Sequence, residues 1–277
     1  MIVLLHSLER FTVRDVLDQA PSTMYSVNGS EPIILAGVHL SSLEVEAVAS
    51  LTRTNGVNGI ILGYCVLRLI NAKNLWTVFY RTKVADVRIP VLKTTPDENL
   101  LKTVRRIKRK GWGYAVVIDS GGKPSNILGL LDLASFYAKS GVATELSNQL
   151  VGKRASTPLY SIREEVTVQG AIRTMLAKHA RRLFVKESSS VLSDRGIIKW
   201  LLSPPTLAGL RDSPESVLKT QIGSIGEVLH RPSFVEPGTN GETALKLALE
   251  NDAHCVITQD KRQILTPWDL TVRLQAL

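Results

Sequence analysis

The chain has 277 residues, of which 44% are hydrophobic and 5% aromatic, and its formal net charge at pH 7 is +9. This size and composition suit one large or two compact domains with an aliphatic core. The two cysteines, Cys65 and Cys255, and the five scattered histidines lack metal-ligand spacing, which argues against a metal site and favours a reducing compartment. The positive charge fits an anionic partner such as a nucleotide phosphate, a nucleic acid or an acidic protein.

The sequence predicts no membrane span and no signal peptide. The longest apolar stretch, residues 59–70, is too short to cross a bilayer and contains Arg68. The apolar residues 1–5 are followed at once by polar residues and are too short for the hydrophobic region of a signal peptide. We therefore expect a cytoplasmic protein.

A strand-to-helix junction recurs four times along the chain, at residues 61–63, 127–129, 191–193 and 264–266. Each junction is a short apolar run that ends in Gly, Ser or Thr and leads into a helical pattern. The steps from 63 to 129, from 129 to 193 and from 193 to 266 are 66, 64 and 73 residues. This spacing predicts four repeats of one small unit.

The first repeat has two readings. With Gly63 as its junction, residues 32–63 hold a first strand, a helix and a last strand but lack one strand of the hairpin, which the N-terminal 25 residues would supply. In the alternative, residues 11–20 form the helix and residues 23–37 form the hairpin. We prefer the first reading because its step of 66 residues matches the next step of 64.

Each of the other repeats predicts a strand, a helix, a two-stranded hairpin and a second helix. The second repeat has capping residues at Thr95 or Asp97 and a helix end at Gly111, and the fourth has a tight hairpin tip at Asp260-Lys261. The predicted apolar helix faces are Leu100, Leu101, Val104 and Ile107 in the second repeat, Val168, Ala171, Ile172, Met175 and Leu176 in the third, and Ala244, Leu245, Ala248 and Leu249 in the fourth.

These units resemble the CBS (cystathionine β-synthase) domain, and four of them resemble two tandem CBS pairs, also called Bateman modules. Similar arrangements occur in the gamma subunit of the AMP-activated kinase and in stand-alone prokaryotic CBS proteins. The resemblance is clearest over residues 83–202 and 222–277. It implies an α/β fold of four β-α-β-β-α repeats in two pseudo-twofold pairs, the first with the second and the third with the fourth. The expected repeats are residues 1–80, 81–140, 151–203 and 218–277.

The resemblance also implies a ligand site at the junctions. CBS repeats that bind adenine nucleotides often carry Gly-apolar-apolar-Thr/Ser-x-x-Asp there, and the Asp accepts hydrogen bonds from the ribose hydroxyls. The Thr/Ser and Asp positions correspond to Thr266 and Asp269 in the fourth repeat, Gly129 and Asp132 in the second, Ser193 and Gly196 in the third, and Gly63 and Val66 in the first. The fourth repeat departs from the pattern at Gln263. In the alternative reading, Thr-x-x-Asp at a helix start is a capping box that needs no ligand.

Basic residues near the clefts are the expected phosphate partners. The candidates are Arg181 and Arg182 before a strand of the third repeat, His254 at the similar place in the fourth, and Arg231 and Lys93 beside the leading strands of the fourth and second repeats. Arginine suits phosphate because its planar fork donates two parallel hydrogen bonds. Each of these residues also reads as a solvated side chain beside a strand.

The helix at residues 102–110 suggests a different partner. Lys102, Arg105, Arg106 and Arg109 share one side of this helix, and Trp112 follows it. Such a surface could hold a nucleic-acid backbone. The alternative is the ordinary polar face of an amphipathic helix.

No catalytic motif occurs, and the four repeats account for nearly all of the sequence. We therefore expect a protein that is not an enzyme and has no cofactor, and that binds AMP, ADP or ATP, with S-adenosylmethionine as a further option. It would act on an unidentified protein partner as an energy-sensing regulator, either as a homodimer or as a compact monomeric disc. The alternatives are a nucleic-acid-binding protein and a ligand-free CBS scaffold for protein–protein interaction.

Overall fold

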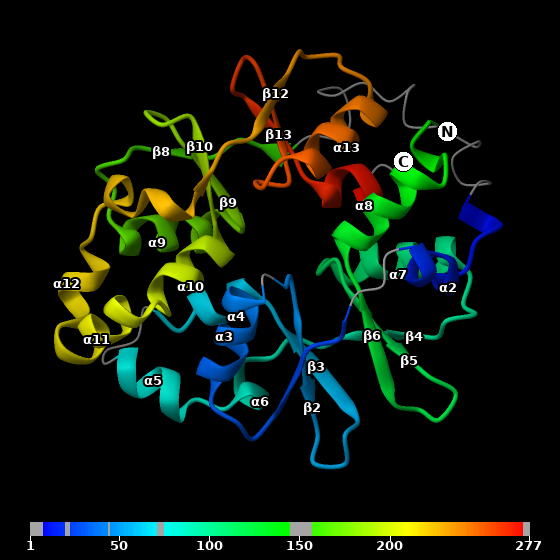
Figure 1. Cartoon of the computed structure of the whole chain (residues 1–277), viewed down its shortest axis with the longest axis horizontal. Coiled ribbons are helices and arrows are strands. Elements are labelled where there is room, and N and C mark those ends of the chain that lie inside the picture. The colour runs from blue at the N-terminus through cyan, green and yellow to red at the C-terminus, as the bar shows by residue number, and fades with distance from the viewer. Residues whose placement is uncertain (1–7, 20–22, 44, 71–74, 145–156, 274–277) are drawn as a thin grey trace. The chain divides into compact units, whose positions relative to one another are not determined.

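The structure is a computed structural model that describes residues 8–19, 23–43, 45–70, 75–144 and 157–273 (Figure 1). The chain forms two compact units, each of which combines distant segments. Unit 1 contains the N-terminal segment and most of the second and fourth expected repeats, and unit 2 contains most of the first and third. The segments are Met1–Met24, Val91–Leu159 and Pro232–Leu277 in unit 1, and Tyr25–Pro90 and Tyr160–Arg231 in unit 2.

The second repeat lies in unit 1 and has the predicted order of elements. Its helix α7 buries the predicted apolar face and ends at Gly111, whose φ of 78° is left-handed, as predicted. The predicted caps at Thr95 and Asp97 are wrong, because the Asn99 side chain accepts the backbone N–H of Lys102 at 3.1 Å and so begins the helix. The elements are β4 (Leu92–Thr94), α7 (Leu100–Lys110), β5 (Ala115–Ile118), β6 (Pro124–Leu128) and α8 (Leu130–Lys139).

The fourth repeat completes unit 1. Its hairpin turns at Asp260 and Lys261, as predicted, and Lys261 has a positive φ of 54° there. The last helix, η3, is a π-helix, a wide form that is frequent at functional sites. The elements are β12 (Ser233–Val235), α13 (Gly241–Glu250), β13 (Val256–Thr258), β14 (Gln263–Leu265) and η3 (Trp268–Arg273).

The structure of the first repeat, in unit 2, differs in part from the elements predicted from the sequence. The stretch of residues 32–63 was expected to begin with a strand, but helix α3 begins at Ile33, directly after Pro32, and its buried side packs against α10 of the third repeat. The leading strand is β1, and the hairpin of β2 and β3 is complete within the repeat. The alternative reading is therefore wrong in its hairpin at residues 23–37, whereas its helix at residues 11–20 is present as α2 (Val13–Gln19). The elements are β1 (Ser26–Asn28), α3 (Ile33–Ser42), β2 (Val48–Leu51), β3 (Val57–Ile61), α4 (Gly63–Leu67), α5 (Leu75–Arg81) and α6 (Val84–Val87).

The third repeat completes unit 2. Its helix α9 buries four of the five predicted apolar residues, and Leu176 is half-buried. The Thr167 side chain caps this helix by accepting the N–H of Gly170 at 3.1 Å. The elements of the repeat are β8 (Ser161–Ile162), α9 (Val168–Lys178), β9 (Arg182–Val185), β10 (Ser190–Ser193) and α10 (Asp194–Leu201). The segment that follows them in unit 2 holds α11 (Pro204–Asp212), α12 (Pro214–Leu218), the 3₁₀ helix η2 (Ile222–Val228) and β11 (Leu229–His230).

Leading segments are exchanged between the third and fourth repeats. Strand β7 (Thr157–Pro158) leads into the third repeat but pairs with β14 of the fourth, whereas β11 leads into the fourth but pairs with β10 of the third. In the same way Ile89, which leads into the second repeat, bridges to Ile60 of the first. Each of these leading segments therefore pairs with a strand of the neighbouring repeat in the sequence, while the pairing of whole repeats and their exact boundaries stay a prediction.

One continuous apolar core fills unit 1. Helix α8 contacts α13 and η3 there, and the Tyr137 hydroxyl donates a 3.4 Å hydrogen bond to the Thr271 carbonyl. Helix α2 (Val13–Gln19) contacts α8, and the N–H of its first residue, Val13, donates to the carbonyl of Glu98, just before α7, at 3.0 Å. The expectation that the N-terminal residues supply a strand to the first repeat is therefore wrong for residues 13–19. Within the described ranges, no helix is long and apolar enough to cross a bilayer.

Candidate functional site

The four junctions share one local geometry, in which the residue before the helix and the residue three positions later face each other. Where the later residue is Asp or Cys, its side chain accepts the backbone N–H of the earlier residue, as in a reciprocal helix cap. The pairs are Leu62 and Cys65, Gly129 and Asp132, Ser193 and Gly196, and Thr266 and Asp269. The preferred junction of the first repeat is thus confirmed to within one residue, but Leu62 and Cys65, not Gly63 and Val66, occupy the two positions.

Asp269 is the most enclosed carboxylate of these junctions, with a side chain that is 1% exposed. Its Oδ2 accepts the backbone N–H and the hydroxyl of Thr266, both at 2.9 Å. The sequence therefore placed Thr266 and Asp269 correctly side by side. Burial raises the pKa of the Asp269 carboxyl, and the hydrogen bonds from Thr266 and Thr157 offset only part of that effect.

The other oxygen of Asp269 faces two groups that the sequence reading missed. Its Oδ1 accepts the Thr157 hydroxyl at 2.8 Å and lies 3.4 Å from Nη1 of Arg273. The same Nη1 lies 3.4 Å from Thr157 Oγ1. Thr157 comes from β7, so strand exchange brings it to a carboxylate 112 positions later in the chain. The spacing of Arg273, four residues after Asp269 on a helix, could have signalled that contact.

Asp132 occupies the corresponding place in the second repeat and is half-buried. Its Oδ2 accepts the backbone N–H of Gly129 at 2.7 Å. A Cβ atom added at Gly129 would lie 3.3 Å from both this oxygen and the ring of Tyr114. The second junction therefore has the acid but leaves little room for a hydroxyl-bearing residue at position 129.

The third junction uses a different acid from the one expected. Ser193 caps α10 by accepting the N–H of Gly196 at 3.0 Å. The next residue, Asp194, is buried, and its Oδ2 accepts Nε of Arg181 at 2.8 Å. Arg181 was a predicted phosphate ligand, but here it forms an ion pair within the protein.

The remaining predicted phosphate residues lie in both units. Lys93 on β4 is exposed, and His254 is half-buried just before β13, both in unit 1. Arg182 is half-buried at the start of β9, and Arg231 is exposed just after β11, both in unit 2. Their role as phosphate ligands stays a prediction.

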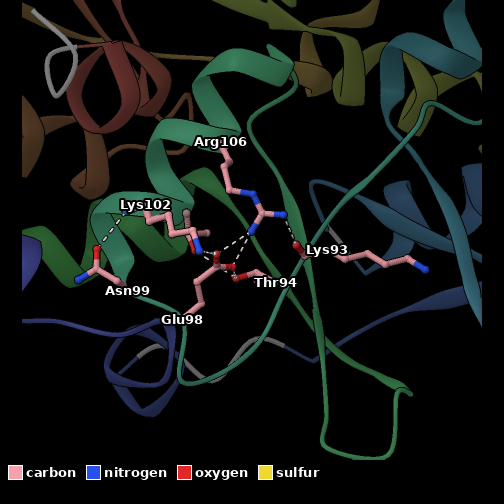
Figure 2. Close-up of polar contacts among 7 residues, drawn as sticks. Lys93, Thr94, Glu98, Asn99, Lys102 and Arg106 are labelled. Atoms are coloured by element: carbon pink, nitrogen blue, oxygen red, sulfur yellow. Dashed lines mark hydrogen bonds and ion pairs between the residues drawn. The ribbon is translucent and has the colours of Figure 1, made fainter.

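The basic side of α7 is partly neutralised by an acid that the sequence reading overlooked. Figure 2 shows Glu98 beneath the helix, where Nη1 of Arg106 donates to its two oxygens at 2.6 and 2.8 Å and Thr94 donates at 2.5 Å. Nζ of Lys102 forms an ion pair with the same carboxylate at 3.3 Å. Burial alone would raise the pKa of Glu98, but the hydrogen bonds from Thr94 and Arg106 and the nearby positive charges lower it.

Two of the four basic residues proposed for nucleic acid are therefore bound to Glu98, while Arg105 and Arg109 are exposed. Figure 2 also shows the Lys93 side chain pointing away from Glu98, while its carbonyl accepts Nη2 of Arg106 at 2.8 Å. This arrangement favours an ordinary amphipathic helix, and nucleic-acid binding stays a prediction.

Among the described residues, no group of His, Cys, Asp and Glu side chains is arranged to hold a metal ion.

Comparison by sequence gives no relative, since no family model and no curated protein matches the chain. Comparison by structure does find similar proteins. Protein MJ1225 of Methanocaldococcus jannaschii, which has been proposed as an archaeal homologue of g-AMPK, matches 94% of this chain over 99% of its own, with a TM-score of 0.76 and 14% identity.

Two further similar structures each match about half of the chain. One is the CBS domain of a CBS-domain-containing membrane protein from Sphaerobacter thermophilus, at 13% identity over 47% of this chain and 90% of that one, with a TM-score of 0.40. The other is the CBS domain of a bacterial CNNM/CorC family Mg²⁺ transporter in complex with ATP, at 14% identity over 47% and 89%, also with a TM-score of 0.40. The full-length similarity, together with the four small sheets, confirms the predicted α/β fold of four CBS repeats in two pairs.

Proposed function

We propose that this chain, which has the fold of two tandem CBS pairs, is a regulatory protein that binds an adenine nucleotide at the junction of its fourth repeat. The observation that carries the proposal is the set of donors around Asp269. A helix cap needs only the contact to Thr266, whereas Asp269 also has Thr157 and Arg273 on its second oxygen. A carboxylate that gathers donors from two separate chain segments is suited to hold hydroxyl groups.

The ribose of a nucleotide offers the same chemistry as the groups now at Oδ1. Its two hydroxyls are donors, and a carboxylate oxygen accepts two hydrogen bonds. A ribose could therefore replace the Thr157 hydroxyl and the Arg273 guanidinium without leaving Asp269 unsatisfied. The displaced hydroxyl and guanidinium would then be available to the ligand, and the guanidinium suits phosphate.

The other predicted residues extend this proposal to further sites. Asp132 would hold a second ribose at the second repeat, and Lys93 and His254, which share unit 1 with both acids, would approach phosphate groups. In unit 2, Ser193, Arg182 and Arg231 would approach phosphate groups. Arg181 would first have to leave Asp194, so the third repeat is the weaker candidate.

AMP, ADP and ATP all satisfy these requirements, whereas S-adenosylmethionine supplies the ribose but no phosphate. The proposed action is regulatory and not catalytic. Nucleotide binding would shift the population between two shapes of the protein, and a protein partner would respond to that shift. Such a shift needs a ligand with different affinity for the two shapes.

The test begins with mass spectrometry of small molecules released from freshly purified, denatured protein, followed by calorimetric titration of AMP, ADP and ATP. We expect a bound adenine nucleotide and a measurable affinity. Asp269→Ala should weaken binding by about 1.5–3 kcal/mol, the size of a charge-assisted hydrogen bond. Asp252→Asn, on the exposed residue Asp252 of the same repeat, is the matched control and should bind normally. Unchanged affinity in a folded Asp269→Ala variant would remove Asp269 from the site.

A ligand-free scaffold is the second candidate function. It is favoured by the fact that the capping bonds at all four junctions form within the chain, with no ligand needed to satisfy them. This candidate predicts that no adenine nucleotide raises the melting temperature of the protein. A nucleotide-specific rise in that temperature would exclude it.

A further inference from the structure

Large apolar side chains are exposed on two adjacent helices of unit 2. Leu35 and Val38 on α3, Leu43 directly after it and Tyr80 on α5 are 38–44% exposed. Helices α3 and α5 contact each other (Figure 1), and the Tyr80 ring packs on the half-buried Trp76 with ring centroids 4.5 Å apart. Helix α3 contains no Asp, Glu, Lys or Arg residue. This surface, which we call the α3 face, is therefore apolar and almost uncharged.

Helix α3 differs in this respect from the first helix of each other repeat. The exposed residues of α7, α9 and α13 include charged side chains, as is usual for a helix with one side in water. A helix that is apolar on all sides is ordinarily buried, so the α3 face has the composition of a contact surface. The exposed residues are Leu35, Val38 and Ser42 on α3, Lys102, Arg105, Arg109 and Lys110 on α7, Arg173, Ala177 and Lys178 on α9, and Thr243, Lys246 and Glu250 on α13.

The exposed residues of α3 have the spacing of a helix–helix contact and fit a copy of themselves. Leu35, Val38 and Ser42 are three and four positions apart, the spacing with which one helix packs on another. When two α3 helices pack antiparallel about a twofold axis beside Val38, the large Leu35 of one copy lies level with the small Ser42 of the other. A twofold dimer requires such a surface, because the same residues serve both partners.

The charge of the chain also favours a second copy at this surface. The formal net charge is +9, so two copies repel each other wherever their basic surfaces meet. Two α3 faces bring no like charges together from their helices and remove apolar area from water. Trp76 and Tyr80 on α5 add aromatic rings, which are enriched at protein interfaces.

We propose that two copies of this chain associate through the α3 face, with their α3 helices antiparallel about a twofold axis beside Val38. The test measures the mass of the full chain by sedimentation velocity over a range of concentrations. The wild type should dimerise with a Kd of about 10 μM or tighter. Val38→Lys brings two like charges together at the axis and should weaken the association by about a hundredfold or more. Ala177→Lys is the matched control, because it adds the same charge at an exposed position of α9 in unit 2 and should dimerise as the wild type does.

Disulfide cross-linking tests the antiparallel arrangement. Both native cysteines are buried, so an added surface cysteine is the one that reacts. Val38→Cys lies beside the axis and should join two copies on mild oxidation. Leu35→Cys and Ser42→Cys should each cross-link poorly alone and efficiently when the two variants are mixed. Ala177→Cys is the control and should stay monomeric on a denaturing gel.

The outcomes that would overturn the proposal are specific. A wild type that stays monomeric at every concentration excludes the dimer and leaves the α3 face to a different protein. A dimer that persists in folded Val38→Lys lies on another surface. If Val38→Lys does not fold, as judged by thermal melting, Val38→Cys decides, and its failure to cross-link excludes the proposed contact. None of these results depends on nucleotide binding.

Discussion

The hydroxyl of Thr157 donates a 2.8 Å hydrogen bond to Oδ1 of Asp269 and so connects two residues that are 112 positions apart. Thr157 lies on the strand that leads into the third repeat, and Asp269 lies on the last helix of the fourth. The bond therefore couples the exchanged strand β7 directly to the candidate ligand site. A ligand that changes the donors at Asp269 would also act on β7, which is a physical route from binding to a change in shape.

The stability of this connection can be measured with Thr157→Val, which keeps the shape of the side chain but removes the hydroxyl. Because the lost bond is made to a buried carboxylate, we expect a loss of about 1.5–3 kcal/mol in the free energy of unfolding. Urea denaturation followed by circular dichroism is the measurement. Thr157→Ser keeps the hydroxyl and is the control. Equal stability of the Val and Ser variants would show that the bond contributes nothing.

Gly63 is predicted to be required at the start of α4. A Cβ atom there would lie 2.7 Å from Oδ2 of Asp194, and Asp194 is held in place by Arg181 at 2.8 Å. Alanine usually favours a helix over glycine, but this clash should outweigh that gain, so Gly63→Ala should destabilise the fold by about 1–3 kcal/mol. Thermal melting provides the test. In the control, Gly226→Ala, the added methyl group meets no atom within 4 Å, and a variant of Gly63 as stable as this control would contradict the account.

Glu98 is predicted to make stability depend on acidic pH. Its pKa is lowered in the folded state, so its contribution is present above the unfolded pKa of about 4.3 and is lost as the pH falls through the lower, folded value. Glu98→Gln should cost about 1–3 kcal/mol at neutral pH, because Arg106 loses its charged partner, and should flatten the loss of stability on acidification. Urea titrations between neutral and strongly acidic pH give both quantities.

The control for this measurement is Glu215→Gln, since the side chain of Glu215 is 88% exposed and its distance to Lys219 is 3.9 Å. It should follow the wild-type pH profile, because an exposed pair contributes little. The same steep acid profile in Glu98→Gln as in the wild type would mean that Glu98 is not a source of the pH dependence.

Local patterns in the sequence were sufficient for much of the fold. The helical spacing of Leu101, Val104 and Ile107 predicted α7, and all three side chains are buried. The recurring junction placed Thr266 beside Asp269 because both residues belong to one helix start. These predictions succeeded because the interactions that decide them span three or four residues.

The failures have equally physical causes. The apolar run at residues 33–35 reads as a strand, but packing against α10 makes it the first turn of a helix. Asp194 was missed because it stands at the first helical position of α10, where the motif expects no acid. Its partner, Arg181, comes from the loop between α9 and β9. Thr157 could not be found from spacing, since only strand exchange brings it to Asp269.

The central claim is that Asp269 accepts the ribose hydroxyls of an adenine nucleotide. The most direct measurement is a calorimetric double-mutant cycle that titrates AMP and 2′,3′-dideoxy-AMP into the wild type and into Asp269→Ala. The account predicts that the wild type prefers AMP by about tenfold or more and that the variant does not distinguish the two ligands. An equal preference for AMP in both proteins would contradict it, because the hydroxyls would then be recognised elsewhere.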